Sequence, residues 1–530
     1  MNALLWSTLL VPSAWAAASL ARAYTPIIAQ NRTLSVPSSA PLGRQIIDAA
    51  FQSYSIELSS MVDFAGNLSH PNTLSHRLLQ NLFSLSGAHP LIRAGGTTAN
   101  RAIWVQNQTA AIIATFSPSS PDQPSALTIG PKFMESFHTF PSGTKYIFGL
   151  NFGDGDAGLD QTVLEAAGPV GSLGDSLYAF EIGNEKTSPF PNQNLALTQT
   201  GWPGSSRRPT NWTVQAYVTQ FLQYATAIDS SVPNHPLYQA GAFEAPRALS
   251  NPNHTLWNAE SILYDGIART GMVKTIAEHD VCISSRCVRV LLMFGAKRCA
   301  WRTVCTWGDE FDFCKSIPYR PPSPSLPNLT LSPPPIKCQG APLISNVFAS
   351  ALWSIDYVLY VSTLHISRLY FHQGTNYRYS AWQPISTPTA DAGVRPLYYG
   401  NLFIATAFAG GEKQVAVLIN ETAFTGYGIY EAGDGRLSGL AVVNLRMWNS
   451  TQKAEERPYT AVQVKVPDEK LGNATVRRLT APGVEIAGNV TWAGRSVDAE
   501  GFLTGTEVVE KIGHGNTVLV GAGEAVLITL

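Results

Sequence analysis

The sequence predicts an α/β protein: a (β/α)8 TIM barrel followed by an antiparallel β-sandwich domain. Two observations predict the barrel. Short apolar runs alternate with helical patterns over residues 43–410, and several runs end in Gly, Asn, Glu or His, as strands do at the catalytic rim of such barrels. A third observation predicts the sandwich. Over residues 411–530 helical periodicity is lost, and short alternating runs are separated by Gly, Asn and Asp turns.

The individual elements are predicted from apolar runs and from helical periodicity. The predicted barrel strands are 55–64, 90–96, 145–152, 177–185, 237–243, 273–279 and 366–374. The predicted helices include 46–51, 213–228 and 347–361, and the last is interpreted as a barrel helix because it contains two serines and an aspartate. Sandwich strands are expected over 414–419, 439–445 and 460–466.

The composition indicates a large globular protein and gives no sign of a nucleic-acid or cofactor partner. With 530 residues, 45% of them hydrophobic, the chain is long enough for a large core and more than one domain. A net charge of −1 without a basic stripe gives no indication of nucleic-acid binding. No metal, nucleotide or flavin motif is present, so we expect no cofactor.

The first residues are typical of a secretion signal. Leu4 to Val11 is mostly apolar, and Ala21-Arg22-Ala23 forms a small-x-small cleavage site, so residues 1–23 are expected to be a signal peptide. The run is too short to span a membrane. Ten Asn-x-Ser/Thr sequons add to the expectation of a secreted, extracellular glycoprotein with N-linked glycans: Asn31, Asn67, Asn107, Asn211, Asn253, Asn328, Asn420, Asn449, Asn473 and Asn489.

The predicted strand 177–185 reads LYAFEIGNE and ends in a polar triplet. A buried strand avoids such residues unless it has reached a barrel rim. There Glu185 could hold a proton as a general acid while Asn184 binds a sugar hydroxyl. The alternative is a strand end with a solvated glutamate.

Several stretches in order resemble the fungal β-glucuronidases of glycoside hydrolase family 79, heparanase-related enzymes of clan A. They are HPLIRAGGTTANR (89–101), the Gly-Asn-Glu strand end, KTIAEHD (274–280), CQGAPLISNVFASALW (338–353) and ISRLYFHQGTNYRYSAWQP (366–384). The resemblance implies a retaining glycosidase with Glu185 as acid/base, and a segment 24–42 that joins the sandwich. It also implies a glycan substrate that carries β-linked glucuronic acid.

The second and sixth predicted strands end in further candidate substrate-binding residues. Arg93 could orient the rim carboxyls, and Gly96 with Thr97 could bring the backbone close to a ligand. The alternative is a buried structural Arg and a tight turn. His279 could contact the nucleophile region or be a satisfied rim histidine.

The loop after the last predicted barrel strand combines polar, aromatic and cationic groups over 372–379, which suits a uronic carboxylate. The resemblance places this loop near the glucuronate carboxylate, and we favour Tyr377 over Arg378 as the contact. Trp382 could stack on a sugar or pack in the core, and packing is favoured.

Residues 281–337 do not fit the resemblance, which stops after Asp280 and resumes at Cys338. All six cysteines of the chain fall between residues 282 and 338: Cys282, Cys287, Cys299, Cys305, Cys314 and, directly after this segment, Cys338. They could form a disulfide framework, whereas a metal site is disfavoured because no CxxC spacing is present. We prefer a third interpretation, in which 281–337 is translated from a shifted frame or a retained intron.

The family's nucleophile is expected on the seventh strand, where Leu329 to Pro334 contains no carboxylate. Glu310 is the only Glu in the window, but its Asp-rich, Cys-flanked context does not match. Three functions therefore stay open: an exo-β-glucuronidase acting on glucuronic or 4-O-methyl-glucuronic acid, a catalytically inactive sugar-binding protein, and an endo-β-glucuronidase.

Overall fold

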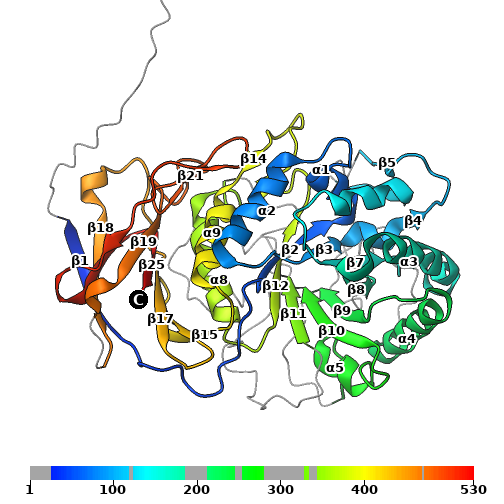
Figure 1. The fold of residues 1–530 in the computed structure, drawn as a ribbon, viewed down its shortest axis with the longest axis horizontal. Helices are drawn as coiled ribbons and strands as arrows, with labels where there is room; N and C mark the ends of the chain where they lie inside the picture. The colour runs from blue at the N-terminus through cyan, green and yellow to red at the C-terminus, as the bar shows by residue number, and fades with distance from the viewer. Residues whose placement is uncertain are drawn as a thin grey trace, which may run out of the picture.

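The computed structural model describes residues 26–118, 123–184, 212–244, 253–279, 328–332, 343–467 and 471–530. Glu185, Glu310, the predicted signal peptide and all of 281–337 except 328–332 lie outside the described residues. Figure 1 shows a barrel and a β-sandwich side by side, with helices α8 (Phe348–Val361) and α9 (Pro396–Ala407) between them.

Eight parallel strands close into a barrel, which confirms the predicted (β/α)8 fold. Around the barrel they run in the order β2 (Gln52–Glu57), β3 (Ile92–Gly95), β7 (Tyr146–Leu150), β8 (Leu177–Ile182), β9 (Tyr238–Glu244), β10 (Val273–His279), β11 (Asn328–Ser332) and β12 (Arg368–Gln373), and β12 pairs with β2. The first predicted strand, 55–64, starts and ends too late, because after Glu57 the chain turns into the 3-10 helix η1 (Leu58–Ser60) and the short helix α1 (Met61–Ala65). The seventh position is filled by β11, from within the anomalous segment.

The helices cover the outside of the barrel: α2 (Thr73–Ser86), α3 (Leu159–Leu173), α4 (Val214–Ser231), α5 (Ala259–Tyr264), α8 and α9. Local capping explains several of their ends. The side chains of Asn72 and Thr213 accept hydrogen bonds from the first turns of α2 and α4, and α2 ends at Gly87 in the left-handed conformation. Among the described residues, no helix combines the length and the apolar character that crossing a membrane requires.

The predicted helix 46–51 is wrong. Ile47 instead forms an isolated bridge with Lys413, a residue distant in sequence, and Asp48 caps a turn by accepting from the backbone N of Ala50 at 2.7 Å. The side chain of Asp48 is further held by Arg368 at 2.6 Å. Tertiary pairing therefore overrides the local helical pattern.

The β-sandwich is confirmed as the second architecture. One sheet has the order β15 (Lys413–Asn420), β16 (Phe424–Glu431), β17 (Leu437–Asn444), β25 (Glu524–Thr529), β19 (Thr475–Thr480) and β20 (Thr491–Trp492), with β23 (Glu510–Lys511) paired to β19. The other sheet contains β1 (Ile27–Ser35), β18 (Pro458–Lys465) and β24 (Thr517–Gly521). Apolar residues such as Leu34, Val442 and Val462 fill a shared core.

Several smaller elements follow the barrel strands or connect the larger elements. After β3, the 3-10 helix η2 (Thr97–Arg101) leads into a three-stranded sheet of β4 (Ala102–Trp104), β6 (Ala126–Ile129) and β5 (Ile112–Thr115), which the sequence patterns did not predict. Two short hairpins complete the fold: β13 (Trp382–Gln383) with β14 (Gly393–Val394), and β21 (Ser496–Val497) with β22 (Leu503–Thr504).

Candidate active site

Polar side chains gather where several barrel strands end. Because all strands are parallel, their carboxyl ends meet at one rim of the barrel. On β2, Ser55 and Glu57 lie two residues apart, so both side chains point to the same face of the strand. These polar groups are almost fully buried: Ser55, Glu57, Arg93, Glu181, Gln239 and His279. Buried polar groups need partners, and the site supplies them.

Arg93 on β3 is the centre of the first group of contacts. Its Nε donates to Oε1 of Glu181 at 2.8 Å, and its Nη2 contacts the same oxygen. Nη2 also donates to Oδ1 of Asn184 at 2.7 Å, and Nη1 donates to Oγ of Ser55 at 3.0 Å. The buried charge is therefore paired and hydrogen-bonded, as a charge in a low dielectric must be.

The second oxygen of Glu181 is also held. Nε2 of Gln239, on β9, donates to Oε2 of Glu181 at 2.5 Å, and Oε1 of Gln239 accepts from Oγ1 of Thr275 at 2.9 Å. The carboxylate is thus fixed from β3 on one side and from β9 and β10 on the other. It serves as a rigid anchor for Arg93.

Asn184 is held on three of its four polar groups. Nδ2 of Asn100 donates to its carbonyl O at 2.7 Å, its backbone N donates to Oδ1 of Asn100 at 3.2 Å, and its Oδ1 accepts from Arg93. Among the described residues, its buried Nδ2 has no hydrogen-bond partner. A fixed amide with spare donors suits a ligand oxygen. The next residue in the chain, Glu185, lies outside the described part.

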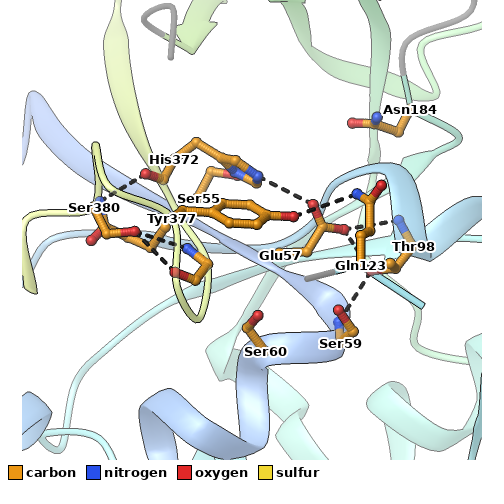
Figure 2. A network of polar contacts seen from close by, with 12 residues as sticks. Ser55, Glu57, Ser59, Ser60, Thr98, Gln123, Asn184, His372, Tyr377 and Ser380 are labelled. Carbon is orange, nitrogen blue, oxygen red and sulfur yellow. Dashed lines mark hydrogen bonds and ion pairs between the residues drawn. The ribbon is translucent and has the colours of Figure 1, made fainter. Parts of the chain in front are cut away.

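Glu57 forms a second polar centre at the end of β2. Its Oε1 accepts from the backbone N of Thr98 at 2.8 Å and from Oγ1 of Thr98 at 2.5 Å, and its Oε2 lies 3.3 Å from Nε2 of His372. Figure 2 shows Glu57 between these two residues. Burial by itself would raise the pKa of Glu57, but the hydrogen bond and electrostatic attraction of His372 and the two hydrogen bonds of Thr98 lower it, so the carboxylate is ionised.

Gly96 and Thr97 lie beside this carboxylate. Gly96 has a φ of +89°, and a Cβ atom there would lie 2.5 Å from Oε2 of Glu57. A glycine is therefore needed at position 96 because the backbone there lies close to the carboxylate of Glu57. The sequence predicted a close approach to a ligand, but the group that is approached belongs to the protein. Thr97 is buried at the start of η2.

The loop after β12 presents Tyr377 to the same region. The hydroxyl of Tyr377 accepts from Nε2 of Gln123 at 3.5 Å, and the Tyr377 and His372 rings lie 6.0 Å apart between centroids. Figure 2 shows this hydroxyl beside Gln123 and Glu57. Arg378 is exposed. Of the two candidates, Tyr377 is the one that lies in the polar cluster.

His279 and Trp382 occupy different environments. His279, at the end of β10, is buried, and burial followed by repulsion from Arg93 lowers its pKa to about 3, so its ring is neutral. Trp382 is fully buried, donates from Nε1 to Oγ of Ser75 on α2 at 2.9 Å, and packs edge-on against Tyr54. Of the two roles considered for Trp382, the favoured one, packing in the core, is what the structure shows, and the stacking alternative is wrong because the ring lies between the barrel and helix α2.

The sequence identified part of this site. Of the predicted residues, Arg93, Gly96, Thr97, Asn184, His279 and Tyr377 lie at the rim. The sequence did not single out Ser55, Glu57, Thr98, Glu181, Gln239 or His372. A signal for two of them was present, since Ser53, Ser55 and Glu57 alternate with Tyr54 and Ile56, the pattern of a strand with a polar inner face.

Comparisons with known proteins identify relatives of this chain. Residues 426–527 match the glycosyl hydrolase family 79 C-terminal beta domain. A β-glucuronidase of Aspergillus niger is 31% identical over 507 residues, covering 92% of this chain and 89% of the relative. A β-glucuronidase of Neurospora crassa is 29% identical over 524 residues, covering 91% and 90% of the two chains.

Solved structures share the fold. A 4-O-α-L-rhamnosyl-β-D-glucuronidase from Fusarium oxysporum, in complex with Rha-GlcA, superposes with a TM-score of 0.72 at 24% identity, covering 94% of this chain and all of that one. A family 51 arabinofuranosidase from Xanthomonas axonopodis superposes with a TM-score of 0.55 at 14% identity, covering 94% and 99%. At these identities the likeness is one of fold.

Proposed function

The chain belongs to glycosyl hydrolase family 79, and on that premise we propose that it is a secreted β-glucuronidase. It would release terminal β-linked glucuronic acid, or the 4-O-methyl form, from glycans with retention of configuration. The observation that carries this proposal is the fixed Asn184 amide, whose Nδ2 has no partner among the described residues, directly before Glu185. The relatives named β-glucuronidase support the choice of sugar.

Each residue then has a defined task. Glu185 protonates the leaving oxygen and later removes a proton from water. Asn184 donates from Nδ2 to the 2-hydroxyl of the sugar, a contact that strengthens in the transition state. Arg93 binds Oδ1 of Asn184, so the amide cannot rotate and its N–H groups stay directed at the sugar.

Recognition of the uronic acid requires a donor for its carboxylate. We assign this contact to the hydroxyl of Tyr377, which is buried beside Gln123 and lies in the polar cluster. A hydroxyl donor to a carboxylate makes a charge-assisted hydrogen bond, roughly twice as strong as a neutral one. Arg378, exposed on the same loop, has no assigned contact with the sugar.

Retention needs a second carboxyl about 5–5.5 Å from the first, as the nucleophile. By the family resemblance it belongs to the seventh strand, which is β11 in this fold, and the sequence of β11, NLTLS, contains no Asp or Glu. We propose that the native seventh strand supplies the nucleophile and that residues 281–337 are not its native sequence. Sequencing the transcript across this window tests the proposal, and an mRNA that encodes these residues in frame would contradict it.

The experiment compares the chain as given with a chain that carries the transcript's own segment, using 4-nitrophenyl β-D-glucuronide. We expect turnover only from the second chain, and a loss of about 10²- to 10⁴-fold on Glu185→Gln. Glu455→Gln, at an exposed glutamate of the sandwich, is the matched control and should leave turnover unchanged. Full turnover by the Glu185→Gln variant would refute the assignment of the acid/base.

A second candidate function is sugar binding without hydrolysis, which the absence of a carboxylate in β11 favours. It predicts that the chain as given binds D-glucuronate, and that the transcript encodes 281–337 as written. Endo-cleavage, the third possibility, differs in its products: oligosaccharides appear first, whereas the proposed exo-enzyme releases the monosaccharide.

A further inference from the structure

Two of the polar groups described above are joined through Ser55. Arg93 donates from Nη2 to Oδ1 of Asn184 at 2.7 Å and from Nη1 to Oγ of Ser55 at 3.0 Å. The same Ser55 oxygen lies 2.9 Å from Nδ1 of His372. Asn184 is therefore connected to His372, on β12, through two residues that are 3% and 0% exposed.

A second path leads from His372 back to Asn184. Nε2 of His372 lies 3.3 Å from Oε2 of Glu57, whose other oxygen accepts from the backbone N of Thr98 at 2.8 Å. Thr98 belongs to the 3-10 helix η2, and so does Asn100, which bonds the backbone O and N of Asn184 at 2.7 and 3.2 Å. The two paths form a closed ring, which we call the Asn184 ring: Asn184, Arg93, Ser55, His372, Glu57, Thr98 and Asn100.

The donors of the ring can be assigned so that each proton is used once. Because Arg93 donates to Oγ of Ser55, the single hydroxyl proton of Ser55 is available for Nδ1 of His372. The ionised carboxylate of Glu57 can only accept, so Nε2 of His372 is the donor in that contact. His372 thus joins the two halves through different ring nitrogens.

We propose that His372 is a positioning residue that sets the orientation of the Asn184 amide through this ring, although the two residues make no direct contact. The ring lies in a buried region, where hydrogen bonds are strong and a loosened link is costly. With His372 in place, η2 is held against Glu57 and Arg93 is held by Ser55, so Asn184 is fixed from its backbone and from its side chain. The sugar contact of Asn184 rests on the proposed function, but the ring does not.

A double-mutant cycle between His372→Gln and Asn184→Ala tests the proposal. The Gln amide can reach Glu57 or Ser55 but cannot replace both ring nitrogens, so the ring opens. Ser55→Ala removes the hydroxyl that joins Arg93 to His372 and changes the side-chain volume very little. It replaces His372→Gln in the cycle if that variant does not fold. His514→Gln, at an exposed histidine of the sandwich, is the matched control. The readouts are the melting temperature and the affinity of the chain for D-glucuronate.

We expect His372→Gln to weaken D-glucuronate binding about tenfold in the unaltered chain and less than about twofold in the Asn184→Ala background. The loss of melting temperature in the double variant should likewise be smaller than the sum of the single losses. Additive losses in both readouts would overturn the ring, even with glucuronate binding intact. Coupled melting temperatures without glucuronate binding by any variant would support the ring and refute the proposed function.

Discussion

The barrel and the sandwich each contain an arginine–glutamate pair, and the two pairs differ in burial and in the other partners of the arginine. In the barrel, the side chains of Arg93 and Glu181 are 4% and 1% exposed. In the sandwich, those of Arg478 and Glu524 are 23% and 6% exposed. Arg478 also binds both oxygens of Glu510, at 2.7 and 2.9 Å, and the carbonyl of Leu519 at 2.6 Å.

This difference is the reason for assigning the barrel pair to the proposed site. Among the described residues, the acceptors of Arg478 are the carboxylates of Glu510 and Glu524 and the carbonyl of Leu519. This cation therefore links the strands β23, β24 and β25 to its own strand, β19. Arg93 instead donates one hydrogen bond to the side-chain oxygen of Asn184, whose Nδ2 has no hydrogen-bond partner among the described residues. The hydrogen bonds of the sandwich pair are made within the protein, whereas the barrel pair holds an amide that still has donors for the proposed ligand.

The largest effect is expected when the barrel pair is broken. Arg93→Gln leaves the buried carboxylate of Glu181 without its cation, which costs about 3–5 kcal/mol in the free energy of unfolding. Glucuronate binding should be lost as well, because Asn184 is released. Urea unfolding and calorimetric titration measure both, with the exposed Arg436→Gln as control. Wild-type stability of Arg93→Gln would contradict the account of this pair.

A smaller and more selective effect is expected at the amide itself. Asn184→Ala removes the spare donors and leaves the Arg93–Glu181 pair in place, so we expect glucuronate affinity to fall about tenfold while the free energy of unfolding changes by about 1 kcal/mol. Titration of both chains with D-glucuronate measures the first and urea unfolding the second. Unchanged affinity would mean that Asn184 does not contact the sugar.

A further buried carboxyl, that of Glu165, has no cationic partner within the part of the chain that the structure describes. Glu165 on α3 accepts from the backbone N of Asn151 at 2.9 Å, and burial raises its pKa from 4.5 to about 8. The folded protein therefore keeps a proton that the unfolded chain releases, so stability falls as the pH rises from 4.5 to 8. Glu165→Gln keeps the acceptor and removes the titration.

The expected result for Glu165→Gln is a melting temperature above that of the unaltered chain by at least about 2–4 °C at pH 8, the change made by 1 kcal/mol in a chain of this size. At pH 4 the two melting temperatures should agree. Melting curves across this pH range measure the difference, and a constant offset would show that Glu165 does not titrate in the window.

The smallest effect is expected in the sandwich. Arg478→Gln removes a partly exposed cation, so we expect a loss of about 1 kcal/mol in the free energy of unfolding and no change in glucuronate affinity. The same titration and unfolding measurements apply. A loss of affinity comparable to that of Arg93→Gln would show that the two pairs do not divide into a structural pair and a site pair.

The sequence predicted the parts of the fold that depend on local pattern. The strand 273–279, VKTIAEH, was predicted with the bounds that β10 has. The helix at 46–51 was wrong because Ile47 pairs with Lys413, a contact that no local window contains. The small sheet after η2 was missed for a related reason, since its strands have only three or four residues each.

The residues of the candidate site also divide into those that local sequence predicts and those that depend on contacts between distant residues. Arg93 and Asn184 could be predicted because they lie in or just after short strands and within stretches that match a family motif. His372 lies near the end of β12, in a stretch that the sequence identified, but its proposed role depends on Ser55 and Glu57, which are 317 and 315 residues away in the chain. Such pairings follow from barrel closure, where β12 meets β2, and they become visible only in three dimensions.

The most direct measurement of the central claim is the ratio of turnover of 4-nitrophenyl β-D-glucuronide to that of 4-nitrophenyl β-D-glucoside, by the chain that carries the transcript's own segment. The two substrates differ only at C6, where a carboxylate replaces a hydroxymethyl group. We predict a strong preference for the glucuronide, because the site offers the Tyr377 hydroxyl for that carboxylate. Equal turnover of the two substrates, or turnover of the glucoside alone, would contradict the account.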